Sequence, residues 1–135
     1  MTNKVEKITH LGDLHCRNYI RKEEYYEQFN KFLKEQRKLE PDRIFIGGDL
    51  GHQKNVISPE LVEMLSWFLK SCADICPVLL ICGNHDCLVN NKDRLDILTP
   101  IVNNLNSKNI WYFKESGCYV DNLDKDIVYV VYSCL

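Results

Sequence analysis

The sequence predicts an α/β fold, in which a largely parallel sheet is flanked by helices. Short apolar runs without a polar face alternate with longer stretches of helical periodicity, and such runs are typical of strands buried on both sides. A strand, a helix and a second strand in succession lie parallel, because the crossover between them is right-handed. Two of the apolar runs, 44–46 and 78–81, are followed within two residues by glycine. We expect helices on both faces of this sheet.

The expected strands and helices alternate as far as residue 113, and two further strands follow. In chain order they are a strand at 5–10, a helix at 23–39, a strand at 44–46, a helix that begins at 59, a strand at 78–81, an amphipathic helix from about 93 to 105, and strands at 110–113, 117–120 and 127–132. The first helix is predicted because Tyr26, Phe29 and Leu33 share one face, with Lys and Glu on the other. Pro41 ends it.

The second helix has a recognisable start. Ser58 is an N-cap residue, and Pro59 suits the first helical position because that position needs no backbone N–H. Its expected apolar face consists of Leu61, Val62, Leu65, Phe68 and Leu69. Pro77 opens the buried strand that follows. The last two strands are expected to pair as an antiparallel hairpin across residues 121–126.

Composition and cysteine usage exclude several classes of protein. The chain is 45% hydrophobic and 27% charged with a net charge of -2, which argues against a large basic nucleic-acid surface but not against a local one. No stretch approaches the roughly 18 apolar residues of a membrane span, and no signal peptide begins the chain. We therefore expect no membrane, and a cytoplasmic location or the host-cell interior if the gene is viral. The seven cysteines are expected to be free packing residues.

Three expected strands end in glycine followed by carboxylate, imidazole or amide groups. Asp13 and His15 follow the first, Asp49 the second, and Asn84 and His85 the third. The carboxyl ends of parallel strands form one edge, so these groups are expected to converge. Oxygen and nitrogen donors without thiolate suit Mn²⁺, Fe or Zn²⁺. An extended backbone would point the side chains of Asp13 and His15 the same way, and Asp49 could bridge two ions.

Several residues also have simpler interpretations. Aspartates after glycine often cap loops, but together with the histidines these carboxylates favour a metal site. His10 is expected to pack or to bond a backbone carbonyl, and His52 is either a solvated loop residue or functional. The aromatic run 111–113 is expected to pack in the core rather than to stack on bases. The cations that could contact a DNA backbone, or simply be scattered surface charges, are Lys54, Lys92 and Arg94.

These motifs, in this order, resemble the first three motifs of the calcineurin-like metallophosphoesterases, over about residues 5 to 90. The resemblance implies the first half of a two-sheet, four-layer (αββα) sandwich. It also implies that Asp13 and His15 bind one of two divalent ions and that Asp49 bridges them. Asn84 would bind the second ion and the substrate, and His85 would contact the scissile phosphate and protonate the leaving oxygen.

Within that family the sequence is similar to the SbcD-type and phage recombination endonuclease subunits of double-strand-break repair nucleases. Residues 48–52 and 58–60 carry this similarity, as does the stretch 8–15. It implies hydrolysis of DNA with two Mn²⁺ ions, with Fe²⁺, Zn²⁺ or Mg²⁺ as alternatives. His52 would then be a catalytic residue that positions the DNA end. The implied partners are DNA, an SMC-like coiled-coil ATPase and a second copy of the protein.

The chain also departs from the family pattern. No histidine follows His85, so the later histidine motifs of the family are missing. We expect residues 1–135 to be the N-terminal portion of a single longer domain, which alone binds metal weakly and hydrolyses little or nothing. Two other functions remain open. One is a phosphomonoesterase or cyclic-nucleotide phosphodiesterase on the same site, and the other is a non-catalytic scaffold of the same fold.

Overall fold

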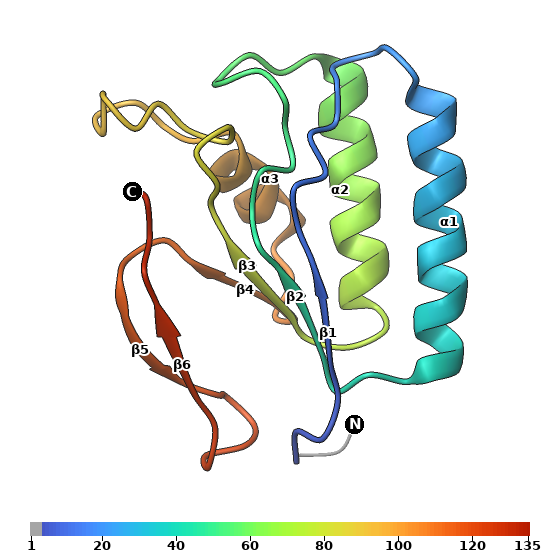
Figure 1. The fold of residues 1–135 in the computed structure, drawn as a ribbon, viewed down its shortest axis with the longest axis vertical. Helices are drawn as coiled ribbons and strands as arrows, with labels where there is room; N and C mark the ends of the chain where they lie inside the picture. The colour runs from blue at the N-terminus through green and yellow to red at the C-terminus, as the bar shows by residue number, and fades with distance from the viewer. Residues whose placement is uncertain (1–3) are drawn as a thin grey trace.

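The computed structural model describes residues 4–135, which form a parallel sheet, helices and a separate strand pair (Figure 1). The elements are β1 (Ile8–Leu11), α1 (Lys22–Leu39), β2 (Arg43–Ile46), α2 (Pro59–Ala73), β3 (Val78–Ile81), α3 (Leu98–Leu105), β4 (Ile110–Phe113), β5 (Gly117–Val120) and β6 (Val128–Val131). The sheet has the order β1-β2-β3-β4 and is parallel throughout, whereas β5 and β6 are antiparallel. The predicted α/β fold with a parallel sheet flanked by helices is confirmed, as is the terminal hairpin.

All three helices of the described chain pack against one face of the sheet, so the expectation of helices on both faces is wrong. Alternate strand residues, among them Ile44, Ile46, Val78 and Leu80, belong to the same buried cluster as side chains of α1, α2 and α3. The strands follow one another across the sheet without reversal. Right-handed crossovers therefore carry every connecting helix over the same side. Helices on both faces would need a reversal of strand order.

The hairpin β5–β6 covers the opposite face of the sheet, on the left in Figure 1. A cavity between the two layers is lined by Phe45, Leu79 and Phe113 of the sheet and, on the hairpin side, by Tyr129 and Val131. The ring of Phe113 stacks on that of Tyr119, with centroids 4.5 Å apart. The described residues thus form one layer of helices and two of strands. The four-layer sandwich stays a prediction.

A buried ion pair fastens the hairpin layer to the sheet. Arg43 of β2 donates from Nε and Nη2 to the two carboxylate oxygens of Asp121, at 2.7 Å each. The Tyr129 hydroxyl donates to the same carboxylate at 2.7 Å. The two charged side chains are 1% and 0% exposed, so the pair is shielded from solvent. Such a pair holds two layers in register because either partner alone would be a buried, uncompensated charge.

The outward face of this hairpin is apolar and open. Val128, Val130 and Tyr132 are 52%, 82% and 93% exposed. They alternate along the strand with half-buried neighbours, as the period of two in a strand requires. An apolar face of this kind is typical of a surface that packs against another element.

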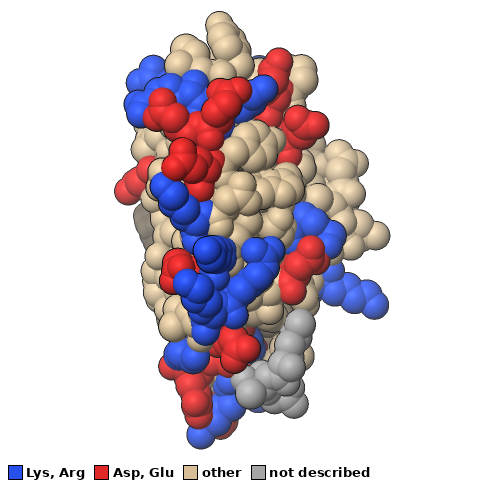
Figure 2. Space-filling view, turned by 90° about the vertical axis from the view of Figure 1, so that its right-hand side faces the viewer, with Lys and Arg blue, Asp and Glu red and all other residues tan. Residues whose placement is uncertain are grey.

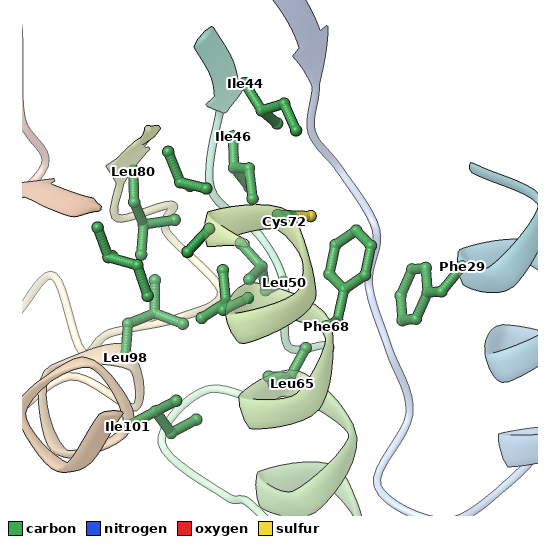
Figure 3. Packing of buried hydrophobic residues seen from close by; sticks show 14 of the residues in the cluster. Phe29, Ile44, Ile46, Leu50, Leu65, Phe68, Cys72, Leu80, Leu98 and Ile101 are labelled. Atoms are coloured by element: carbon green, nitrogen blue, oxygen red, sulfur yellow. The ribbon is translucent and has the colours of Figure 1, made fainter. Parts of the chain in front are cut away.

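The main core lies between the sheet and the helices, as Figure 3 shows from close by. The rings of Phe29 in α1 and Phe68 in α2 stack with centroids 4.0 Å apart. Leu65 of α2 and Leu98 of α3 are fully buried in the same cluster. Burying a side chain of this size contributes about 1.5–3 kcal/mol, so this cluster accounts for much of the rigidity beneath the loops.

Three expected details of the elements are wrong. The first strand begins at Ile8, because the backbone N–H groups of Glu6 and Lys7 donate to the Asp42 carboxylate instead of to a neighbouring strand. Val62 lies outside the apolar face of α2 and is 38% exposed, whereas Met64 is buried there.

The third helix is shorter than expected. It spans Leu98–Leu105 rather than starting near residue 93. The Asp96 carboxylate accepts hydrogen bonds from the backbone N–H groups of Leu98 and Thr99 at 3.0 and 2.8 Å. Asp96 thus supplies the acceptor that the first N–H groups of a helix lack within the helix itself. The preceding residues form turns, including a bond from Arg94 N–H to the Asn91 carbonyl.

The start of α2 agrees with the prediction from sequence, and the charged residues at the two ends of α1 suit its helix dipole. Ser58 accepts the backbone N–H of Leu61 at 3.2 Å, and proline begins the helix, as predicted. Helix α1 has acidic residues in its first turn and basic residues in its last, which suits its dipole. Figure 2 shows this side of the molecule, where Lys and Arg group near the middle and again at the upper left, with Asp and Glu interspersed among them. Among residues 4–135, no helix is both long and apolar enough to cross a membrane.

Candidate metal centre

The loops after β1 and β2 lie side by side beyond the ends of their strands. These ends point to the same edge, at the top of Figure 1, and the end of β3 joins them there. Backbone N–H groups of the first loop donate to carbonyls of the second in three pairs: Asp13 to Gly48 (3.2 Å), His15 to Asp49 (2.8 Å) and Cys16 to Leu50 (2.8 Å). The pairing of the two strands thus continues through the residues that carry the predicted ligands.

The third loop is locked onto the second by close backbone contact. A Cβ on Gly83 would lie 2.1 Å from Oδ1 and 2.2 Å from the backbone nitrogen of Asp49, so only glycine fits. A Cβ on Gly48 would likewise lie 2.4 Å from the Gly83 nitrogen. The backbone N–H of His85 donates to Oδ1 of Asp49 at 2.8 Å. This approach brings the third motif against the second.

Asp86 reinforces the same junction and is a residue that the sequence argument did not include in the site. Its side chain is fully buried, and its oxygens accept the backbone N–H groups of Gly51 at 2.9 Å and Gly83 at 3.0 Å. Burial raises the pKa of Asp86, whereas these two hydrogen bonds act in the opposite direction. The signal in the sequence that could have identified Asp86 is its position directly after Asn84 and His85.

The structure brings Asp13, His15 and Asp49 together. Nε2 of His15 lies 3.7 Å from Oδ1 of Asp13 and 3.7 Å from Oδ2 of Asp49. One ligand atom from each of these residues lies within 4.8 Å of the other two. The Asp13 side chain is 85% exposed and that of Asp49 13%, so the group spans from the surface into the protein. A divalent cation can be held at such spacings, and the ligand role of each residue stays a prediction.

A second group shares His15 and consists of the three histidines His15, His52 and His85. Their nitrogen atoms also converge within 4.8 Å. The rings of His15 and His85 meet edge to face with centroids 4.7 Å apart, and that of His52 lies 5.7 Å from His15. Nδ1 of His85 lies 2.8 Å from the His52 carbonyl oxygen. Because a carbonyl only accepts, Nδ1 of His85 carries a proton there.

The backbone at these residues differs from the expected extended geometry. Asp13, His15 and Asp49 have φ angles of 53°, 46° and 52°, in the left-handed region that non-glycine residues rarely adopt. Leu14 still points away, into the core. Left-handed backbone at a non-glycine residue costs on the order of 1 kcal/mol or more and clusters at functional sites. The side chains of Asp13 and His15 therefore approach each other because both residues have left-handed backbone, and not because they alternate along an extended strand.

The donor set fits a cation. Nδ1 of His15 and Nδ1 of His52 are buried, and neither has a hydrogen-bond partner within the described part of the chain. A buried imidazole nitrogen without a partner is costly, and an ion or a bound ligand would relieve that cost. Burial, together with the charges of Arg17 and the other two histidines, lowers the pKa of His52. The neutral imidazole, which is the form that binds metal, is thereby favoured.

The remaining predicted residues lie at the periphery. Asn84 stands beside His85 in the third loop with an exposed side chain, and its ligand role stays a prediction. His10 packs its ring against Phe45, with centroids 5.3 Å apart, away from the site. The DNA-contacting role of the exposed cations also stays a prediction; they are Lys54, Lys92 and Arg94.

The aromatic run packs in the core only in part, since all three residues are half-buried. Tyr112 packs against the core cluster and its hydroxyl donates to Asp96 at 2.7 Å, whereas Phe113 stacks on Tyr119 of the hairpin at the opposite face of the sheet. All seven cysteines are free, and five of them are buried. Three of these thiols lie together, an arrangement that the sequence did not indicate because one of them comes from a distant strand.

Comparisons with known proteins agree with this geometry. A model of the calcineurin-like phosphoesterase family matches residues 6–132. The chain is 40% identical over 120 residues to "Uncharacterized protein R555" of Acanthamoeba polyphaga mimivirus, covering 86% of this chain and 9% of that protein. It is 29% identical over 124 residues to "DNA double-strand break repair protein Mre11" of Nanoarchaeum equitans (strain Kin4-M), covering 85% and 34%.

The chain thus spans less than two thirds of each of these relatives, 9% of one and 34% of the other. The family match nevertheless extends over all three motif loops and all six strands of the described residues. Two metal ions are typical of this family, and the clustered histidines and aspartates are a suitable donor set. The chain belongs to the calcineurin-like phosphoesterase family.

Proposed function

We propose that this chain forms the metal-binding part of a DNA nuclease that hydrolyses phosphodiester bonds by a two-metal mechanism. The family match supports hydrolysis of a phosphoester, and the similarity to a protein named for DNA double-strand break repair supports DNA as the substrate. Mn²⁺ is the proposed ion, because oxygen and imidazole donors suit it. The alternatives Fe²⁺, Zn²⁺ and Mg²⁺ are tested by exchange of the added metal.

The observation that carries the proposal is the position of Asp49 between two groups of ligands. Its Oδ2 faces Nε2 of His15 at 3.7 Å, on the side of the first loop. Its Oδ1 accepts the N–H of His85 at 2.8 Å, on the side of the third loop. A carboxylate with one oxygen toward each neighbour has the position that a bridge between two ions needs.

The roles of the other residues follow from their places around Asp49. Asp13 and His15 would hold the first ion, and Asn84 would contribute to the second. Two such cations, when bound, lower the pKa of a water and neutralise the charge that develops on the phosphoryl oxygens. His52 adds an imidazole whose lowered pKa favours its neutral form.

His85 is proposed to act on the leaving oxygen. Its Nδ1 is held by the His52 carbonyl, which fixes the orientation of the ring and leaves Nε2 as the atom available to substrate. As an imidazolium, His85 would donate the Nε2 proton to the leaving oxygen, and the carbonyl would keep the ring in place. The backbone bond to Asp49 couples this acid to the proposed metal bridge.

The test uses the full-length protein, since the chain spans only part of its relatives. Linear DNA and a small aryl phosphate are offered in parallel, each with Mn²⁺ and with EDTA. The nuclease proposal requires Mn²⁺-dependent cleavage of DNA that Asp49→Ala and His85→Ala each lower by about 100-fold or more. Cleavage of the aryl phosphate alone would favour a phosphomonoesterase, and binding of metal without either activity would favour a scaffold. Undiminished DNA cleavage in either variant would contradict the proposal.

The resemblance also leads us to propose partners for the full-length protein, namely a coiled-coil ATPase of the SMC type and a second copy of itself. Sedimentation of the purified protein tests the dimer, and co-purification with a coiled-coil ATPase encoded in the same genome tests the heteromeric complex. A monomer that recruits no ATPase would contradict both.

A further inference from the structure

Three thiols converge at the end of β3, apart from the histidines and aspartates of the predicted centre. They belong to Cys82, which directly follows β3, to Cys87 in the third loop, and to Cys134, which follows β6. Their sulfur atoms all lie within 4.8 Å of one another. Cys82 and Cys87 are buried and Cys134 is half-buried, so the cluster can be reached from one side. Figure 1 shows the C-terminal end of the chain approaching this edge of the sheet.

The spacing of these sulfurs suits a tetrahedral soft cation. Zinc–sulfur bonds of about 2.3 Å at tetrahedral angles place two sulfurs roughly 3.8 Å apart. The sulfurs of Cys87 and Cys134 are 3.8 Å apart already. A disulfide would instead require them to close to about 2.05 Å. The third sulfur, within 4.8 Å, needs a shift of about 1 Å at most to complete the same triangle.

The thiols have only weak partners in the surrounding loop. Cys82 donates to the Gly83 carbonyl at 3.4 Å, and Cys134 donates to the Cys82 carbonyl at 3.3 Å. Cys87 contacts the Gly83 carbonyl at 3.5 Å. Thiol hydrogen bonds of this kind are weak, so a cation that displaces the three protons breaks few strong contacts. Burial raises the pKa of the Cys82 and Cys87 thiols, and the bonds to the cation must offset this cost of deprotonation.

We propose that Cys82, Cys87 and Cys134 bind one Zn²⁺ as three thiolates, with a fourth position open to water or another ligand. Binding releases the three thiol protons, and the resulting site carries one net negative charge. Soft thiolates select Zn²⁺ over the hard cations that suit oxygen donors. The thiol site should therefore prefer Zn²⁺ over Mn²⁺ and Mg²⁺, which suit the oxygen donors of the neighbouring centre.

The proposed ion has a definite structural consequence. Cys82 and Cys87 bracket residues 83–86, the loop that presents His85, and Cys134 lies at the end of the hairpin layer. A cation shared by the three would fasten this loop to the end of the hairpin layer. The ion would hold the loop in position, and this role does not depend on the proposed nuclease activity.

Cd²⁺ alone is the probe, because it binds thiolates and gives an ultraviolet thiolate-to-cadmium charge-transfer absorption. The histidines and aspartates contain no sulfur and contribute nothing to this band. The reduced chain of 135 residues is expected to develop the band with saturation at one Cd²⁺ per chain, and added Zn²⁺ should displace it. Cys134→Ser should lose at least a third of the band, because one of the three thiolates is gone. It should also bind Cd²⁺ about tenfold or more weakly, since loss of a residue that only contacts a metal ligand already lowers metal affinity by about tenfold.

Matched variants separate this site from other thiols and from misfolding. Cys118→Ser removes an exposed cysteine of β5 and should leave the band unchanged. Cys87→Ser provides a second test if Cys134→Ser fails to fold by circular dichroism. The absence of the band in the reduced wild type, or its persistence in folded Cys134→Ser or Cys87→Ser, would overturn the proposal.

Discussion

The carboxylate of Asp49 and the backbone N–H of His85 are joined by a 2.8 Å hydrogen bond between two loops that are 36 residues apart in sequence. The same carboxylate faces His15 through its other oxygen. Because one side chain connects all three motif loops, its charge is central to both metal binding and the arrangement of the loops.

Asp49→Asn should weaken Mn²⁺ binding by about 10- to 100-fold, because the amide keeps the shape and loses the charge. The electron paramagnetic resonance signal of free Mn²⁺ measures this directly. Asp126→Asn, which removes one carboxylate from the hairpin turn, should bind as the wild type does. Equal weakening in both variants would mean that the effect is only one of net charge.

Gly83→Ala should disturb the site by steric overlap rather than by loss of a ligand. Its new Cβ would meet Asp49 at 2.1 and 2.2 Å, so the third loop must move away. Overpacking of this kind costs about 1–3 kcal/mol in unfolding free energy and should also lower Mn²⁺ affinity. Urea denaturation and Mn²⁺ titration measure the two effects.

The matched control for that substitution is Gly117→Ala in the hairpin. There the nearest atom to a new Cβ belongs to the Tyr119 ring at 3.7 Å, which is ordinary contact. We expect a change within about 0.5 kcal/mol and unaltered Mn²⁺ binding. If Gly83→Ala behaved like Gly117→Ala, the close packing of the second and third loops would be refuted.

Asp121→Ala should be among the most destabilising single changes away from the site. It leaves the Arg43 guanidinium buried and uncompensated, which typically costs about 3–5 kcal/mol. The hairpin should then detach from the sheet, and hydrogen exchange of residues 117–131 should speed up before that of α2. The control is Asp74→Asn, an exposed carboxylate at the C-cap of α2, for which a small change is expected. Equal losses in the two variants would contradict the buried pair.

The same carboxylate predicts a dependence of stability on pH. Burial alone would raise the pKa of Asp121, but hydrogen bonds from Arg43, from backbone N–H groups and from Tyr129 hold it well below its ordinary value. The unfolded chain therefore binds a proton at this group at a higher pH than the folded chain does. The stabilisation is complete near neutral pH and is lost progressively below about pH 5. Unfolding by urea from pH 7 to pH 3 should show this loss, with a shallower slope in Asp121→Asn; equal slopes would contradict the assignment.

Local chemistry made much of the fold predictable from sequence. Ser58 and Pro59 define a helix start whatever the rest of the chain does, and the apolar runs at 44–46 and 78–81 define buried strands. The convergence of Asp13, His15 and Asp49 followed from one rule, that parallel strands end at a common edge. These features depend on neighbours in sequence and on chirality alone.

The features that sequence did not predict depend on long-range geometry. Placement of all helices on one face follows from the strand order, which no local pattern encodes. The Arg43–Asp121 pair joins residues 78 apart. Cys134 meets Cys87 across 47 residues. The left-handed backbone at Asp13 and His15 is fixed by the hydrogen bonds that hold the first loop against the second, although Asp and His tolerate this conformation better than most residue types.

Paramagnetic broadening by Mn²⁺ tests the metal centre most directly and tolerates weak binding. Substoichiometric Mn²⁺ is added to the ¹⁵N-labelled chain, and the loss of each backbone amide signal is followed by NMR. We predict that the signals of residues 13–15, 49–52 and 84–86 vanish first, that those at the C-terminal end of α1 persist, and that EDTA restores all of them. Uniform broadening, or broadening centred away from Asp49, would contradict the metal centre described above.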